Sequence, residues 1–160
     1  MEKYLLYING EFKEGSKGKF FKAINPADGS EIAEIAEATV DDAKDAIDAA
    51  RNAFDNGVWS NKSFEEISVI IKQIVDKINE NKDKLTELEI KDSGSTFKKA
   101  AEDIYLSARN LNSFAKLALV DLNEVSDVSK EGISKNLIRR EPVGVCAQII
   151  PWNFPLKMAI

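Results

Sequence analysis

Hydrophobic and polar positions alternate near the amino terminus before the pattern changes to a helical period. Tyr4–Ile8 and Glu11-Phe12 flank Asn9-Gly10, a dipeptide that favours a two-residue hairpin turn. Two further short strands are predicted at Phe20–Ile24 and Glu31–Ala36. The first part of the chain therefore predicts β structure.

Amphipathic helices are predicted next. Thr39 and Ser63 are each followed three residues later by an acidic residue, Asp42 and Glu66, which is the pattern of a capping box. A third, shorter helix precedes Thr96, which can cap a fourth. Apolar residues three and four positions apart form one face of the first helix (Val40, Ala43, Ile47, Ala50, Phe54) and of the fourth (Ile104, Ala108, Leu111, Ala115, Ala118). We expect the helices between Thr39 and Leu122 to pack into one compact unit.

The pattern changes again after residue 122. Residues 123–135 are polar and predict a loop or hairpin, and Leu137–Arg140 is a short strand candidate. Val143–Ile150 is almost continuously apolar, which is typical of a strand buried on both faces of a parallel sheet. Pro151–Pro155 then forces a turn into a new helix. Because a parallel partner needs a crossover of about a dozen residues, we expect a truncated chain that associates through residues 137–150.

Composition removes several kinds of chemistry. The chain has no histidine and one cysteine, Cys146, which excludes imidazole relays, an intrachain disulfide and a zinc site of the usual kind. Cys146 lies between Val145 and Ala147 without a cationic neighbour, so we expect a small buried hydrophobe and not a nucleophile. The acidic residues of the helices are expected to be solvated.

Charge and hydropathy limit the partners. The net charge is −5, and the basic residues are dispersed without a basic face, so no nucleic acid is expected. No apolar run is long enough for a membrane span or a signal peptide. These features predict a cytoplasmic protein with no membrane partner.

The turn after the apolar segment is the candidate ligand site. Open α/β sheets bind ligands beyond the carboxyl ends of their strands, where Asn153 lies. An amide held by prolines and aromatic residues can donate a hydrogen bond to a developing oxyanion. The alternative is that Asn153 only satisfies the backbone of the turn, while Trp152 and Phe154 belong to the core. Spacing alone favours this alternative.

A family resemblance changes that balance. Residues 139–156 read RREPVGVCAQIIPWNFPL and closely resemble a signature of the aldehyde dehydrogenase superfamily. Four further segments agree in the same order, namely Tyr7–Phe12, Asn25–Gly29, Ala49–Phe54 and Asp92–Gly94. The resemblance implies an α/β fold that is the amino-terminal part of a Rossmann-like cofactor domain. In this fold, helices and short hairpins precede the first parallel strand–loop–helix unit.

The resemblance also implies a division of the chain. Residues 1–122 would be the hairpin and helical part of the cofactor domain. Residues 123–141 would belong to a bridging β segment used in homo-oligomers. Residues 142–160 would begin the dinucleotide-binding sheet.

The implied activity is NAD- or NADP-dependent oxidation of a small-molecule aldehyde to a carboxylic acid through a thiohemiacetal. Asn153 would be catalytic, by holding the oxyanion. The nicotinamide end of the cofactor site would be lined by Ile149, Ile150, Pro151, Trp152 and Asn153. No metal is implied. In this family the nucleophilic Cys, the general-base Glu and the ribose-binding Lys follow this loop, so we expect the chain alone to be inactive.

Two alternatives remain open. The first is a non-catalytic fragment or pseudoenzyme that acts only through assembly. The second is another enzyme of the superfamily, such as an acyl-phosphate reductase. The Trp-Asn-Phe-Pro sequence at residues 152–155 favours the aldehyde oxidisers over those reductases.

Overall fold

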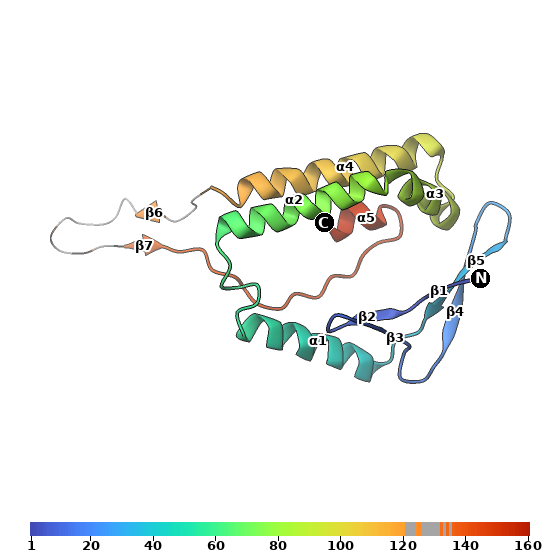
Figure 1. The fold of residues 1–160 in the computed structure, drawn as a ribbon, viewed down its shortest axis with the longest axis horizontal. Helices are drawn as coiled ribbons and strands as arrows, with labels where there is room; N and C mark the ends of the chain where they lie inside the picture. Colours follow the sequence, from blue (N-terminus) through green and yellow to red (C-terminus); the bar gives the residue numbers. More distant parts are fainter. Residues whose placement is uncertain (121–123, 126–131, 133, 135) are drawn as a thin grey trace.

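The computed structural model describes residues 1–120, 124–125, 132, 134 and 136–160 of the chain. These residues form an α/β structure with one three-stranded sheet, two two-stranded sheets and helices (Figure 1). A layer of helices stands beside the strand region, and one helix lies apart from that layer.

The first five strands belong to two separate sheets. β1 (Glu2–Tyr4) runs parallel to β5 (Glu31–Ala36), which also pairs antiparallel with β4 (Phe20–Ile24). β2 (Leu6–Ile8) and β3 (Glu11–Lys13) form an antiparallel hairpin. The single strand expected at Tyr4–Ile8 is therefore divided, because Tyr4 belongs to β1, which pairs with β5, and Leu6–Ile8 pair with β3.

The hairpin between β2 and β3 has the predicted turn. Ile8 pairs with Glu11, so the loop contains only Asn9 and Gly10. Their φ angles are 55° and 83°, and positive values at both positions are what a type I′ turn requires. The Asn-Gly prediction is confirmed.

The predicted helices are all present. Their bounds are α1 (Val40–Asp55), α2 (Phe64–Glu80), α3 (Lys82–Ser93), α4 (Phe97–Leu117) and α5 (Pro155–Ala159). Both expected capping boxes form, and the expected threonine also caps α4 through its side chain. The sequence signals for helix starts are therefore confirmed.

The core lies between α2, α3 and α4. Ile78, Ile104 and Ala108 are its buried centre. Leu156 in the first turn of α5 and Ile160 just after its end pack against that centre, so the last helix is docked onto the earlier ones. The predicted buried face of α4 is confirmed.

α1 does not join this helical core. It contacts β2, and in Figure 1 it lies apart from the layer of α2, α3 and α4. Val40 is 73% exposed and Ile47 is 53% exposed, so the apolar face of α1 is largely uncovered. The expectation of one compact unit from Thr39 onward therefore holds for α2 to α4 and is wrong for α1, whose amino terminus is bonded to the loop after β3 instead. Leu122 lies outside the described residues.

The expected strand at Val143–Ile150 is absent from the structure. The segment has no ladder pairing, because no described strand lies beside it. It runs in Figure 1 between α1 and the helical layer, and a Cβ placed on Gly144 would lie 3.2 Å from Nη1 of Arg51. Val143 and Ile149 are 89% and 99% exposed, so these apolar side chains are not buried by any other part of the described chain.

A short hairpin precedes this segment. β6 (Glu124–Val125) pairs antiparallel with β7 (Leu137–Ile138). The pairing places Glu124–Val125 in a strand, whereas residues 123, 126–131, 133 and 135 of the predicted loop or hairpin lie outside the described residues. It also confirms the short strand within Leu137–Arg140.

Candidate functional site

The five predicted site residues form one exposed stretch of chain. Ile149, Pro151 and Asn153 are exposed, as is Trp152, whose side chain is 79% accessible. Ile150 is at the margin of exposure. The alternative that Trp152 belongs to the core is therefore wrong. The structure places these side chains along a surface of this chain and not inside its core.

The loop is fixed at its downstream end by α5. Pro155 occupies the first turn of this helix, as predicted, and the amide of Met158 donates to the carbonyl of Phe154 at 2.9 Å. Leu156 and Ile160 hold the helix against the core. Asn153 therefore lies two residues before a docked helix.

A second anchor comes from α4. Nζ of Lys99 donates to the backbone carbonyl oxygen of Asn153 at 3.1 Å and to Oδ2 of Asp103 at 2.6 Å. The same ammonium lies 4.5 Å from the centre of the Phe154 ring. Lys99 was not among the predicted site residues. Its position four residues before Asp103 in a predicted helix indicated an ion pair. Its contact with Asn153, 54 positions away, could not be predicted from the sequence.

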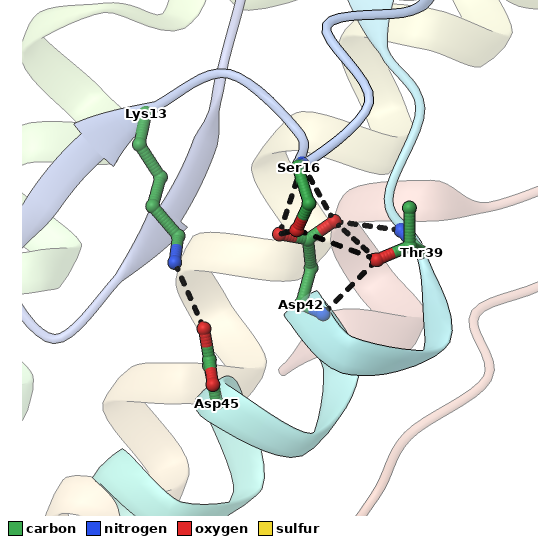
Figure 2. Close-up of polar contacts among 5 residues, drawn as sticks. All are labelled: Lys13, Ser16, Thr39, Asp42 and Asp45. Atoms are coloured by element: carbon green, nitrogen blue, oxygen red, sulfur yellow. Dashed lines mark hydrogen bonds and ion pairs between the residues drawn. The ribbon is translucent and has the colours of Figure 1, made fainter.

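Asp42 is a buried acid, 2% exposed, whose carboxylate accepts several hydrogen bonds, and Figure 2 shows its surroundings. Its carboxylate accepts from the hydroxyl of Ser16 at 2.5 Å and from the backbone amides of Ser16 and Thr39. The Ser16 hydroxyl, followed by the Thr39 and Ser16 amides, holds the pKa of Asp42 well below its usual range. Asp42 is therefore a structural acid that joins the loop after β3 to α1.

The edge of this cluster carries an ion pair. Nζ of Lys13 lies 3.3 Å from Oδ2 of Asp45, one turn along α1 from Asp42 (Figure 2). Both side chains are exposed, so the pair contributes little to stability. It links the end of β3 to α1.

Glu89 is a buried acid without a complete set of partners. It is 7% exposed, and its Oε1 has no hydrogen-bond partner among the described residues. Burial raises the pKa of Glu89, while the Ser93 hydroxyl and the Lys99 ammonium oppose that rise. The expectation that helical acids are solvated is therefore wrong for Asp42, Glu89 and Asp103, which are all buried.

Replacing Glu89 by Gln is expected to stabilise the chain at neutral pH by about 1 kcal/mol, because the variant buries no charge. The pKa of Glu89 is raised in the folded state. The free-energy cost of burying its charge is therefore absent below the unfolded pKa near 4.5, and it is fully present once the pH has risen through the folded pKa. Urea unfolding at pH 7 and at pH 4 should show a gain only at pH 7. An equal gain at both values would contradict this account, and Glu102→Gln, on an exposed face of α4, is the control.

Cys146 differs from its prediction in one respect. The sequence indicated a buried side chain, but the thiol is exposed. The reason is that the segment around it has no partner strand to cover it. That Cys146 is not a nucleophile stays a prediction.

No group of three or more acidic or cysteine side chains in residues 1–120 and the later described ranges is placed to hold a metal ion. No helix described in the structure combines the length and apolar character of a membrane span.

Comparison with known proteins decides the family. A sequence profile of the Aldehyde dehydrogenase family matches residues 12–160. The chain belongs to the aldehyde dehydrogenase family. It is 40% identical over 154 residues to the betaine aldehyde dehydrogenase of Bacillus subtilis (strain 168), covering 96% of this chain and 31% of that protein. It is also 34% identical over 158 residues to the human mitochondrial 10-formyltetrahydrofolate dehydrogenase, covering 97% of this chain and 17% of that protein.

Solved aldehyde dehydrogenase structures share the fold. The structure of betaine aldehyde dehydrogenase from Staphylococcus aureus in complex with NAD+ matches with a TM-score of 0.92 and 37% identity, over 97% of this chain and 30% of that one. An indole-3-acetaldehyde dehydrogenase matches with a TM-score of 0.93 and 32% identity, over 99% and 36%. The chain thus has the fold of the amino-terminal part of an aldehyde dehydrogenase and spans about a third of these structures.

Proposed function

We propose that this chain is the amino-terminal segment of an enzyme that oxidises an aldehyde to a carboxylic acid with NAD+. We further propose that the side-chain amide of Asn153 donates a hydrogen bond to the oxyanion that forms when a thiolate adds to the aldehyde carbon. The observation that carries the proposal is an exposed Pro-Trp-Asn-Phe-Pro loop, fixed by α5 and Lys99, in a chain of this family. Fixed amide donors stabilise such charge without reorganising.

The residues before Asn153 fit the nicotinamide end of a dinucleotide. Ile149 and Trp152 present exposed apolar surface, and Ile150 and Pro151 lie between them. Ligand sites of this kind combine apolar walls with a few placed polar groups. When bound, the cofactor supplies the hydride acceptor, and the role of Ile149, Ile150, Pro151 and Trp152 is to orient its ring and exclude water. The NAD+ in the Staphylococcus aureus relative supports NAD+ here.

We propose three parts for the chain. Residues 1–122 are the hairpin and helical part of the cofactor domain, 123–141 form a bridging segment of a homo-oligomer, and 142–160 begin the dinucleotide sheet. The β6–β7 hairpin supports the bridging role, because in Figure 1 it projects away from the helical layer. We place the enzyme in the cytoplasm.

A chimera tests the proposed function. Residues 1–160 replace the matching segment of the Staphylococcus aureus betaine aldehyde dehydrogenase. We expect the chimera to reduce NAD+ when its aldehyde is added, and the 160-residue chain alone to form no NADH. A folded chimera without activity would contradict the proposal. So would aldehyde-dependent NADH formation by the chain alone that Cys146→Ala abolishes.

A further inference from the structure

Three contacts of one side chain meet at the loop that carries Asn153. Nζ of Lys99 donates to the Asn153 carbonyl at 3.1 Å, pairs with Asp103 at 2.6 Å and lies 4.5 Å from the centre of the Phe154 ring. We infer that Lys99 is a positioning residue that fixes Asn153 for the reaction. This inference rests on the oxyanion role proposed for Asn153.

Lys99 extends from a rigid part of the molecule. It lies in the first turn of α4, beside Ala100 at 0% exposure and five residues before Ile104 in the core. The side chain of Asp103 is only 9% exposed, so its carboxylate cannot be freely solvated and holds the ammonium in place. The position of Nζ is therefore set by the helix and by Asp103 before it meets the loop.

The contact acts on the backbone of the loop and not on the amide of Asn153. A hydrogen bond to the carbonyl oxygen fixes the peptide plane between Asn153 and Phe154, while the ammonium also attracts the face of the Phe154 ring. The side-chain amide of Asn153 is not used by this bond. Because an oxyanion donor must be held within about 0.5 Å of its productive position, fixing the backbone at Asn153 itself matters.

α5 alone does not provide this restraint. Its docking through Leu156 and Ile160 begins three residues after Asn153, and Phe154 at its N-cap makes no side-chain capping bond. Lys99 restrains the backbone at Asn153 itself, where the position of the oxyanion donor is set. Lys157 also lies near the Phe154 ring, at 5.2 Å, but it belongs to α5 and moves with it.

The first experiment measures hydrogen exchange of the Met158 amide, which donates to the Phe154 carbonyl beside the Lys99 contact, in the 160-residue chain. Lys99→Met keeps most of the aliphatic stem and removes the ammonium, and Lys99→Arg restores a cation. Lys98→Met is the matched control, because Lys98 is exposed in the same turn. We expect exchange to rise roughly 10-fold in Lys99→Met, to return toward the original rate in Lys99→Arg, and to stay unchanged in Lys98→Met. Unchanged exchange in Lys99→Met would overturn the inference.

A second variant separates positioning from stability. Lys99→Met leaves the buried Asp103 carboxylate unpaired, which can lower the melting temperature by itself. The double variant Lys99→Met/Asp103→Asn removes that charge, so its melting temperature should recover while exchange of the Met158 amide stays fast. If loop protection recovers together with the melting temperature, Lys99 acts only through Asp103 and the inference fails.

Activity in the chimera completes the test. There we expect Lys99→Met to lower kcat by roughly 10-fold or more with little change in KM for NAD+, and Lys99→Arg to recover part of it. If Asn153→Ala leaves kcat normal, the proposed function fails while the exchange result for Lys99 stands. If Asn153→Ala lowers kcat but Lys99→Met changes neither kcat nor exchange, the inference about Lys99 fails alone.

Discussion

Replacing Asn153 by Ala in the chimera is expected to lower kcat by about 10²–10³-fold, because one donor to the oxyanion is lost. The affinity for NAD+ should stay nearly the same, since Ile149, Ile150, Pro151 and Trp152 remain in place. Steady-state kinetics with saturating NAD+ measures kcat, and KM for NAD+ reports the cofactor site. The lost hydrogen bond is made only in the transition state, so kcat and kcat/KM for the aldehyde should fall together.

Gln148→Ala is the matched control for this prediction. Gln148 carries an exposed amide on the same segment, five residues before Asn153. If kcat falls equally in both variants, the loss reflects disturbance of the segment and not an oxyanion donor. Pre-steady-state kinetics must show that hydride transfer limits turnover, since a slow product release would hide the loss. A normal rate of the chemical step in Asn153→Ala would remove Asn153 from the mechanism.

Local signals in the sequence predicted local structure well. Asn9-Gly10 gave the type I′ hairpin because both positions favour a positive φ. Thr39 and Ser63 gave helix starts because their hydroxyls accept from amides three residues later. Each of these signals depends on residues that are neighbours in the chain.

Long-range pairing was not readable in the same way. β1 and β5 are parallel neighbours, although about thirty residues separate Glu2 from its partner Ala33. No short pattern shows that the amino-terminal strand divides between two sheets. The apolar run at Val143–Ile150 resembled a buried strand, but its pairing depends on neighbours that the pattern cannot specify.

The candidate site shows the same division. The loop sequence at residues 151–155 carried the resemblance, and the family is confirmed. Lys99 contacts the loop, and Asp103 holds the Lys99 ammonium. In the sequence these two residues have the spacing of an ordinary solvated ion pair on a helix. The burial of Asp103 results from tertiary packing, which the amphipathic pattern does not show.

At micromolar concentrations the 160-residue chain is expected to associate through residues 137–150. Val143 and Ile149 are almost fully exposed, and the segment between them has no ladder pairing in the described structure. Exposed apolar side chains next to unpaired backbone donors and acceptors favour strand pairing with another copy. Light scattering after size exclusion should show a mass that rises with concentration, and exchange at residues 143–150 should slow as it does.

The double variant Val143→Lys/Ile149→Lys should remain monomeric where the original chain associates, because charges on an open edge oppose pairing. Val40→Lys/Ile47→Lys is the matched control. Those two residues are also exposed and apolar, but they lie on α1, whose backbone groups are already bonded within the helix. Ending the chain near residue 122 is a poor control, because it removes α5 and uncovers the core at Ile104. If the α1 variant alone abolishes association, exposed apolar area and not the open edge drives it. If the original chain stays monomeric with residues 143–150 protected, a partner within the chain already covers that segment.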